Sequence, residues 1–194
     1  MVTKEVLRKQ LRNDRQALGP EVRERLSQEI STNCLKFLKQ YPDIRHVHMF
    51  LPIKKLQEVN TVPLLHLLFG LNYHVYSSVT VHNKRKMATV KLRKETVFGS
   101  DKFGIPVPND PIVAEGAKEV ELVFVPLLGV DKMGNRIGYG LGFYDVFFQE
   151  LGSDVLKIGL SFMAPMSLEI PHESHDVPLN GCIYPEGIVL FENN

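Results

Sequence analysis

Residues 120–130 have the sequence VELVFVPLLGV and residues 134–145 have the sequence GNRIGYGLGFYD, which together predict a strand, a glycine loop and a helix. The first run is almost wholly apolar, as expected of a strand that is covered on both faces of a sheet. In the second run Gly138, Gly140 and Gly142 alternate with larger residues, so the backbone there can adopt positive φ and approach a ligand closely. A helix that follows such a loop offers unpaired N–H groups to phosphate. We therefore predict that this loop binds a nucleoside triphosphate.

Two charged residues flank the glycines. Arg136 at the loop entrance provides a planar fork of hydrogen-bond donors that suits phosphate, and Asp145 at the exit provides a carboxylate for hydrated Mg²⁺. The GxGxG spacing differs from the dinucleotide fingerprint GxGxxG, and the loop lacks the GK[ST] ending of a P-loop. The alternative is a tight connection before an apolar helix at Tyr144–Leu151, in which the glycines only permit close packing of helix and sheet.

The composition is that of an ordinary globular protein. The chain has 194 residues, of which 44% are hydrophobic and 23% charged, so we expect one core and a single domain over residues 1–194. The formal net charge of +1 argues against a nucleic-acid-binding protein. Cys34 and Cys182 form no CxxC motif, which favours a reducing compartment. Neither a signal peptide nor a run of ~18 apolar residues is visible, so a cytoplasmic protein without a membrane partner is expected.

The first 40 residues predict two helices. Val2–Gly19 carries an apolar stripe and is stopped by Gly19-Pro20, and Pro20 then opens a second helix that runs to about Gln40. On one face of the first helix lie four cations, Lys4, Arg8, Arg12 and Arg15. They form either a cationic ridge that binds polyphosphate or a solvated face eased by neighbouring acidic residues. We expect this helical segment, residues 2–40, to pack on an α/β core.

Strands and helices alternate over the rest of the chain. Strands are predicted at residues 47–51, 73–81, 87–92, 120–130, 155–162 and 187–191, with a helix at 62–71 and a proline-rich surface loop at 103–111. This order predicts the α/β class, as a single three-layer domain with a mostly parallel sheet flanked by helices, Rossmann-like. Ligands of such sheets bind at the carboxyl ends of strands. The loops after Leu51 and Val130 are therefore expected to border a site.

Other polar groups of the chain allow further sites. His46 and His48 alternate on a strand and would face one side, either as metal ligands or, because no third ligand is evident, as partly exposed strand residues. An oxygen-rich group suits Mg²⁺ better than zinc, or else forms a solvated loop: His172, Glu173, His175 and Asp176. The basic run at 84–86 lacks the aromatic neighbours of a nucleic-acid site.

Three separated motifs resemble those of the 5-formyltetrahydrofolate cyclo-ligases, also called methenyltetrahydrofolate synthetases. The first is Lys4-x-x-Leu7-Arg8 with Arg15 and Leu18, which is similar to the basic opening helix of that family. The second is EVNT at residues 58–61, similar to an EVDT-like segment. The third runs from Val125-Pro126 through Asp131, Gly134 and Arg136 to Asp145 and resembles the signature PGLAFD…GxRLGYGGGYYD. Residues 103–105 and His175-Asp176 also match in order, so the likeness covers nearly the whole chain.

The resemblance implies a role for each matched residue. ATP would be bound by Lys4, Glu5, Val6, Leu7, Arg8, Arg136, Ile137, Gly138, Tyr139, Gly140, Leu141, Gly142, Phe143 and Tyr144. The folate would be bordered by Arg8, Ile53, Glu58, Tyr139, Gly140, Leu141, Gly142 and Phe143. Asp145 and Asp176 would bind Mg²⁺, and Lys4 and Arg136 would be catalytic.

The implied reaction cyclises 5-formyltetrahydrofolate to 5,10-methenyltetrahydrofolate, with ATP as co-substrate and Mg²⁺ as cofactor. The formyl oxygen would attack the γ-phosphate of ATP to give a phosphorylated iminium species, and N10 would then close the ring as phosphate leaves. Lys4, Arg8 and Arg136 are suitable residues because phosphoryl transfer depends mainly on alignment and charge neutralisation. The partners would be these small molecules alone, with a monomer expected and a dimer as the alternative.

Three residues depart from the family pattern. Leu141 stands where the family often has Gly or Lys, Phe143 where it usually has Tyr, and Val146 where bacterial members often have Arg. Phe143 lacks a hydroxyl but retains a ring that can stack on the pterin. These changes leave open a non-catalytic nucleotide- or folate-binding protein. A sugar-phosphate isomerase or acyl-CoA transferase of a related α/β fold is a third hypothesis.

Overall fold

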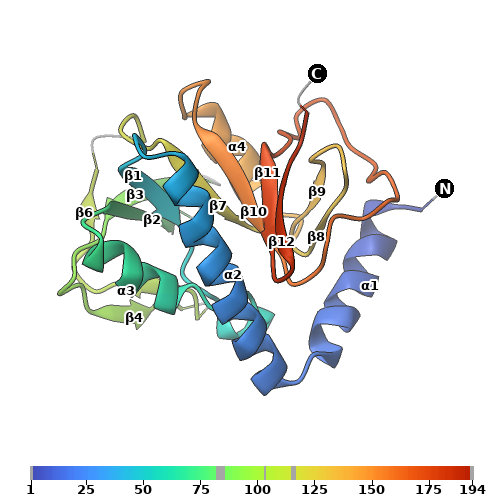
Figure 1. Ribbon diagram of the computed structural model, residues 1–194, viewed down its shortest axis with the longest axis horizontal. Helices are drawn as coiled ribbons and strands as arrows, with labels where there is room; N and C mark the ends of the chain where they lie inside the picture. The colour runs from blue at the N-terminus through green and yellow to red at the C-terminus, as the bar shows by residue number, and fades with distance from the viewer. Residues whose placement is uncertain (1, 82–85, 103, 115–116, 193–194) are drawn as a thin grey trace.

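A large mixed sheet organises the protein (Figure 1). The structure is a computed structural model that describes residues 2–81, 86–102, 104–114 and 117–192. Within these residues eight strands form one sheet in the order β12-β11-β10-β7-β1-β2-β3-β6. The strands are β1 (His46–Met49), β2 (His74–Val81), β3 (Lys86–Lys91), β6 (Ile112–Val113), β7 (Leu122–Pro126), β10 (Leu156–Leu160), β11 (Gly181–Tyr184) and β12 (Gly187–Leu190). Strands β11, β10, β7, β1 and β2 are parallel, whereas β12, β3 and β6 are antiparallel to their neighbours.

Helices cover both faces of this sheet, because the apolar residues of its central strands point alternately to either side. Leu122 and Phe124 of β7 pack in one cluster with α2 (Pro20–Gln40) and α3 (Val62–Gly70), which contribute Ile30, Cys34, Phe37, Leu38, Leu64, Leu65 and Leu68. Val123 and Val125 pack on the other face with Phe147 and Phe148 of α4 (Phe143–Gln149). A helix as short as α4 is not stable alone, and each buried Phe contributes about 1.5–3 kcal/mol through tertiary packing. This packing fixes the start of α4 against the sheet.

The first helix, α1 (Lys4–Ala17), packs apart from the main sheet, beside a hairpin of β8 (Gly129–Val130) and β9 (Arg136–Ile137) (Figure 1). Leu7 and Leu11 are buried there against Leu128, Ile137 and Ile170. Thr3 caps the helix by accepting a hydrogen bond from the Val6 amide at 3.3 Å. The remaining elements are η1 (Lys54–Leu56) and a small hairpin of β4 (Phe98–Ser100) and β5 (Pro106–Pro108). The packing of α1 places its amino end over the glycine loop.

The predicted α/β architecture with a mostly parallel sheet and helices is confirmed. The predicted second helix matches α2 at both ends, because Pro20 opens it and its apolar stripe persists to Leu38. The predicted strand at 120–130 was too long, since β7 ends at Pro126 and Gly129–Val130 instead pair with β9. The loop predicted at 103–111 contains the short strand β5, and β11 was not predicted at all. Phe103 and the basic residues at 84 and 85 lie outside the described residues.

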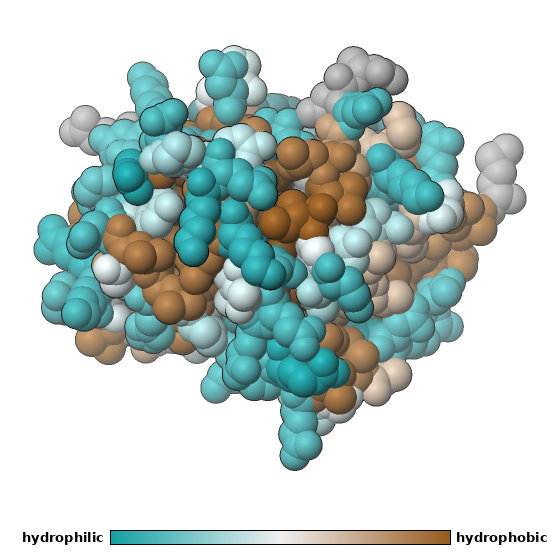
Figure 2. All heavy atoms as spheres, in the orientation of Figure 1, coloured by the Kyte–Doolittle hydropathy of each residue, from teal (hydrophilic) through white to brown (hydrophobic). Residues whose placement is uncertain are grey.

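The surface mixes polar and apolar side chains. Figure 2 shows hydrophilic side chains over much of the face that carries α2, with hydrophobic patches between them. In the described part of the chain, no helix has the length and apolar character needed to cross a membrane.

Candidate active site

A cleft of about 510 Å³ opens where the central parallel strands end. Phe50 and Leu51 follow β1 into it, and Pro126 ends β7. Ser77 lies in the middle of β2, and Ser78 and Thr80 belong to its second half. The amino end of α1, the glycine loop at 138–142 and the start of α4 form the rest of its lining. Parallel strands direct their carboxyl ends to one edge of a sheet, and ligands of α/β proteins bind at such an edge. The predicted position of the site is therefore occupied by a real cleft.

The glycine loop has the backbone conformation that its sequence predicts. Gly140 and Gly142 have φ of +92° and +70°, in the region that favours glycine. Arg8 donates from Nε to the carbonyl oxygen of Gly138 at 2.9 Å, and a Cβ on Gly140 would lie 3.2 Å from the Arg8 guanidinium carbon. Glycine at position 140 therefore permits both the turn and the close approach of Arg8. The cation and the loop are brought together as predicted.

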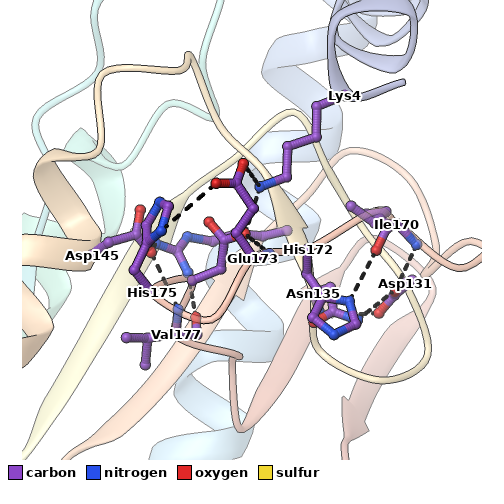
Figure 3. Close-up of polar contacts among 11 residues, drawn as sticks. Lys4, Asp131, Asn135, Asp145, Ile170, His172, Glu173, His175 and Val177 are labelled. Atoms are coloured by element: carbon purple, nitrogen blue, oxygen red, sulfur yellow. Dashed lines mark hydrogen bonds and ion pairs between the residues drawn. The ribbon is translucent and has the colours of Figure 1, made fainter. Parts of the chain in front are cut away.

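The four cations of α1 have different surroundings. Lys4 donates to Asp176 Oδ2 at 2.5 Å and lies 3.6 Å from Glu173 Oε1. Figure 3 shows the Lys4 and Glu173 side chains directed toward one another. Arg15 is 5% exposed and donates to the Tyr139 hydroxyl at 2.7 Å and to the Leu127 carbonyl. Arg12 is exposed, with its guanidinium 5.9 Å from the centre of the Tyr139 ring. The predicted cationic ridge is thus divided, with Lys4 and Arg8 at the cleft and Arg15 buried behind it.

Arg136 is held in the lining of the cleft by two partners. It donates to Asp145 Oδ1 at 2.6 Å and to the Val177 carbonyl, and it lies 4.9 Å from the centre of the Phe148 ring. The Arg136 and Asp145 side chains are 8% and 18% exposed. The proposed phosphate donor and the proposed metal ligand therefore form one ion pair at the start of α4. Such a partly buried pair fixes the position of both groups.

Glu58 forms the other polar feature of the cleft. Its Oε2 accepts a hydrogen bond from the Ile53 amide at 2.8 Å, and its carboxyl also bonds the Tyr139 hydroxyl. Burial raises the pKa of Glu58, and the bonds from Ile53 and Tyr139 and the charge of Arg15 offset only part of this effect. Burial and the Glu58 charge likewise raise the pKa of Tyr139. Arg15, Tyr139 and Glu58 thus form a continuous chain of hydrogen bonds from α1 to the loop after β1.

A loop at 170–177 closes the cleft beside Lys4. Asp176 Oδ2 accepts from the Glu173 amide at 2.7 Å as well as from Lys4. Burial acts to raise the pKa of Asp176, but these two hydrogen bonds and the neighbouring positive charge of Lys4 together outweigh it, and the pKa is lowered. The predicted alternative of a freely solvated loop is therefore wrong for Asp176.

This loop is held at its base by Asp131, which is 1% exposed (Figure 3). Asp131 accepts from the Met133 and Asn135 amides at 2.9 Å each, from Asn135 Nδ2 at 3.0 Å and from the Ile170 amide at 2.8 Å. A buried carboxylate is stable only with such complete satisfaction. Asp131 therefore ties the β8–β9 hairpin to the loop that carries Asp176.

The histidines that were considered as metal ligands have other partners. His46 Nδ1 lies 2.9 Å from the Tyr76 hydroxyl, and His48 Nε2 lies 2.7 Å from Ser78 Oγ. His48 is fully buried, so its prediction as a partly exposed strand residue is wrong. In the described ranges, no group of three or more His, Cys, Asp or Glu residues is arranged to hold a metal ion.

Most of the predicted site residues border this one cleft. They are Lys4, Arg8, Ile53, Glu58, Arg136, Gly138, Tyr139, Gly140, Leu141, Gly142, Phe143, Tyr144, Asp145 and Asp176. Four others do not border it: Glu5 and Val6 are exposed on α1, while Leu7 and Ile137 are buried in the cluster beneath it. The positions of these four side chains do not support the contacts with ATP that were predicted for them.

Sequence reasoning missed the part of the cleft that β2 and its neighbours form. Ser77, Ser78, Thr80 and Met87 line it, and none belongs to a motif, while Ile105 lies in a stretch that matched the family without an assigned role. The positions of these four follow from the pairing of β2 with β1 and β3, which the sequence does not specify. The sequence did contain one indication of this part of the cleft, because several hydroxyl residues stand toward the carboxyl end of the strand predicted at 73–81.

The fold and the cleft define an α/β enzyme in which a cationic glycine loop adjoins an apolar pocket. The model of the 5-formyltetrahydrofolate cyclo-ligase family matches residues 1–185, and the chain belongs to this family. The predicted family and enzyme class, a cyclo-ligase of folate one-carbon metabolism, are thereby confirmed.

Individual relatives agree with the family match. The 5-formyltetrahydrofolate cyclo-ligase of Haemophilus influenzae is 31% identical over 126 residues, which cover 63% of this chain and 67% of that protein. The mouse (Mus musculus) protein of the same name is 25% identical over 190 residues, which cover 93% and 92% of the two chains. The solved structure of Aquifex aeolicus 5,10-methenyltetrahydrofolate synthetase is similar in fold, with a TM-score of 0.79, 24% identity and coverage of 98% of this chain and 94% of that one.

Proposed function

We propose that this chain cyclises 5-formyltetrahydrofolate to 5,10-methenyltetrahydrofolate with release of ADP and phosphate. The observation that carries the proposal is the continuity of a single cleft. At one part of it Lys4 pairs with Asp176 and Arg8 bonds the glycine loop, and its lining continues to Glu58 and the apolar residues Phe50, Leu51 and Ile53. A polyphosphate and a flat heterocycle can therefore lie in contact within it. Contact between them is the first requirement of a transfer from ATP to a folate.

The phosphate end of the cleft consists of Lys4, Arg8, the loop 136–144 and the loop 173–176. Lys4 and Arg8 would bind the phosphates directly, because both reach the cleft from α1. Arg136 would act from its fixed position beside Asp145, where its charge is already oriented. Preorganised charges stabilise a transition state without a cost of reorganisation. On this basis Lys4 and Arg136 are the proposed catalytic residues.

The folate end consists of the residues after β1, the second half of β2 and the ring of Phe143. Ile53 and Phe143 would enclose the pterin, and Glu58 would accept hydrogen bonds from its N–H groups. The Glu58 carboxyl is held in place by the Ile53 amide and Tyr139. The missing hydroxyl at Phe143 removes no contact that orients Glu58, so the folate end retains its polar anchor.

The chemistry then needs two steps. The formyl oxygen attacks the γ-phosphate of ATP and ADP leaves, which gives a phosphorylated iminium species. N10 of the folate attacks the activated carbon and loses its proton, the C–O bond breaks, and inorganic phosphate leaves with the former formyl oxygen and this proton. Lys4 and Arg8 would hold the negative charge of the transferred group throughout, which is the main demand of phosphoryl transfer.

The residues present fit the expected Mg²⁺. Asp145 and Asp176 border the phosphate end of the cleft, although one oxygen of each already accepts hydrogen bonds. A site for Mg²⁺ on a nucleotide needs only one or two carboxylates, because phosphates and waters provide the other ligands. The ion would neutralise charge on the phosphates, and Asp145 and Asp176 are the residues proposed to hold it.

Three further features belong to the proposal. The chain would work as a single cyclo-ligase domain over residues 1–194, in the cytoplasm and as a monomer. The family match over residues 1–185 supports the single cyclo-ligase domain. The cytoplasmic location rests on the cysteine usage of the sequence. Neither a non-catalytic binding protein nor an isomerase or transferase gains support from the relatives.

The test is an absorbance assay with the purified chain. When protein, 5-formyltetrahydrofolate, ATP and Mg²⁺ are mixed, the absorbance of the methenyl product should rise with time. Omission of ATP, or its replacement by an analogue that cannot transfer its γ-phosphate, should abolish the rise. An active chain that is indifferent to ATP would contradict the proposed reaction, and an inactive chain that binds both ligands would support the non-catalytic alternative.

A further inference from the structure

A buried histidine lies directly behind the cleft and takes no part in the reaction described above. His48 of β1 is fully buried, with its ring 4.8 Å from the ring of Phe147 in α4. Its Nε2 lies 2.7 Å from the hydroxyl of Ser78 on the neighbouring strand β2 (Figure 1). Its Nδ1 has no hydrogen-bond partner among the residues that the structure describes. Ser78 itself lines the cleft. The pair therefore connects a buried ring to the surface of the binding site.

The surroundings of His48 keep its ring neutral. Burial lowers its pKa to about 3, and apolar residues surround it on the α4 side of the sheet. A neutral imidazole carries one N–H, on either Nδ1 or Nε2. With the proton on Nδ1, a buried donor would have no acceptor. With the proton on Nε2, the N–H is satisfied by Ser78 and only a lone pair remains unpaired.

The second arrangement is favoured, because orphaned buried N–H groups are rarer than under-satisfied acceptors. His48 then donates to Ser78 Oγ. The Ser78 hydroxyl hydrogen is left without an acceptor among the described residues, since the ring nitrogen at 2.7 Å is its side-chain partner there. Rotation about the C–O bond can direct this hydrogen into the cleft. Ser78 thus becomes a fixed, uncharged hydrogen-bond donor.

We propose that Ser78 is a folate-binding residue that donates a hydrogen bond to a neutral acceptor of the substrate, and that His48 is the residue that positions it. The acceptor would be a carbonyl oxygen or ring nitrogen of the folate. The cations that suit phosphate come from α1 and the glycine loop, whereas the Ser78 side of the cleft has a neutral histidine behind it and Met87 on the adjacent strand. This inference rests on the proposed function for the identity of the ligand.

The first experiment measures folate affinity without turnover. The full chain is titrated calorimetrically with 5-formyltetrahydrofolate in the absence of ATP. Ser78→Ala should bind the folate with a dissociation constant roughly 3- to 10-fold larger than that of the wild type, the scale of one neutral hydrogen bond. In the complete assay the KM for the folate should rise by the same factor, with the KM for ATP unchanged. Ser78→Thr, which keeps a hydroxyl, should restore most of the affinity.

A matched control is available directly across the strand pair. Thr89 of β3 is the partner of Ser78 in the β2–β3 ladder but does not line the cleft. Thr89→Val removes a hydroxyl from the same part of the sheet and should leave folate affinity as it is. Unchanged folate affinity in Ser78→Ala would overturn the proposal, and so would a rise confined to the KM for ATP. Loss of affinity in Thr89→Val equal to that in Ser78→Ala would also overturn it, by assigning the effect to the sheet.

The role of His48 has a spectroscopic readout. Nitrogen-15 NMR of the wild-type ring should show the Nε2–H tautomer without titration between pH 6 and 8. His48→Leu, which cannot donate, should weaken folate binding as Ser78→Ala does and add nothing in the double variant. His48→Gln, which can donate, should weaken it less. The Nδ1–H tautomer, or additive effects in the double variant, would overturn the positioning role.

These measurements separate two failures. ATP-dependent product formation by the wild-type chain tests the proposed function and involves no variant. Folate binding by Ser78→Ala tests the inference and involves no turnover. A chain that forms product normally but binds folate equally well with and without the Ser78 hydroxyl would overturn the inference and leave the proposed function intact.

Discussion

The two ends of the cleft differ in the electrostatic surroundings of their titratable side chains. At the phosphate end, cations and carboxylates form ion pairs, Lys4 with Asp176 and Arg136 with Asp145. At the folate end, burial shifts titratable groups toward their neutral forms, since it raises the pKa of Glu58 and lowers that of His48 to about 3. A polyphosphate needs fixed countercharges, whereas a neutral heterocycle needs hydrogen bonds in a dry pocket. The difference indicates which ligand each end accepts.

The largest expected effect comes from the charge that the phosphate end holds most firmly. Arg136→Ala should lower the rate of ATP-dependent methenyl formation by about 10²-fold or more, the scale of losing one preorganised donor. The substitution also leaves Asp145 without its partner at 2.6 Å. Initial rates at saturating ATP and folate, followed by product absorbance, measure the effect.

The other end of α4 provides the control for this prediction. Lys86 pairs with Glu150 at 2.9 Å, but the two side chains are 56% and 39% exposed. Exposed pairs contribute little to stability, so Lys86→Ala should leave the rate nearly unchanged. Near-normal turnover in Arg136→Ala would contradict the catalytic role of Arg136 and with it the comparison between the two ends.

The phosphate end could be predicted from the sequence because its chemistry is contiguous in the chain. Arg136, the three glycines and Asp145 lie within ten residues, and the preceding apolar run predicts a buried strand. The meeting of Arg8 with Gly138 was also expected, although it joins residues 130 positions apart. This expectation depended on the family resemblance, because a row of cations on one face of a helix is equally compatible with a solvent-exposed face. The helix pattern alone could not separate Arg15, which is buried, from Arg12, which is exposed.

The folate end could be predicted only in part, because strand order assembles it. Ser78 and His48 come into contact since β2 pairs with β1, and periodicity does not specify which strands pair. The end of β7 at Pro126 was missed for a related reason. Apolar residues continue through Leu127 and Leu128, but neither belongs to a strand of the main sheet. Leu127 packs in the cluster on the α4 side of the sheet, and Leu128 packs in the cluster between α1 and the β8–β9 hairpin. Hydrophobicity indicates burial without indicating the partner.

A smaller effect is expected from the polar anchor of the folate end. Glu58→Gln should lower kcat/KM for 5-formyltetrahydrofolate about 30-fold, as expected when a hydrogen bond to a charged acceptor is weakened. The KM for ATP should stay within about twofold, because Glu58 bonds the loop through the Tyr139 hydroxyl, whereas Lys4 and Arg8 are held by Asp176 and by the Gly138 carbonyl. Glu29→Gln, which removes an exposed partner of Arg25 on α2, is the matched control. An equal rise in both KM values would show that the two ends are not separate.

A still smaller effect is expected from the glycine loop itself. Gly140→Ala should raise the KM for ATP about 10-fold, because a left-handed conformation costs an alanine about 1–2 kcal/mol and its Cβ would press on Arg8. Folate affinity without ATP should fall by a smaller factor, because Glu58 and Ser78 keep their positions in the cleft. Gly70→Ala, at a helix end with open space around it, is the control for a general glycine effect. A loss of folate affinity as large as the rise in the KM for ATP would mean that Gly140 contributes equally to both ends.

The smallest expected effect concerns the stability of Glu58→Gln. This substitution should raise the thermal stability of the chain although it lowers its activity. Burial raises the pKa of Glu58 in the folded chain, so its contribution to stability is full below the unfolded pKa of about 4.3 and is lost as pH rises through the folded value. Glu58→Gln cannot ionise, so its Tm should exceed that of the wild type by a few degrees at pH 8, with a difference that shrinks toward pH 4. Calorimetry across this range measures it. A variant that is less stable at pH 8 would show that the bonds from Ile53 and Tyr139 outweigh burial. Hydrogen bonds would then stabilise the charged carboxylate of the folate end, as ion pairs stabilise the carboxylates of the phosphate end.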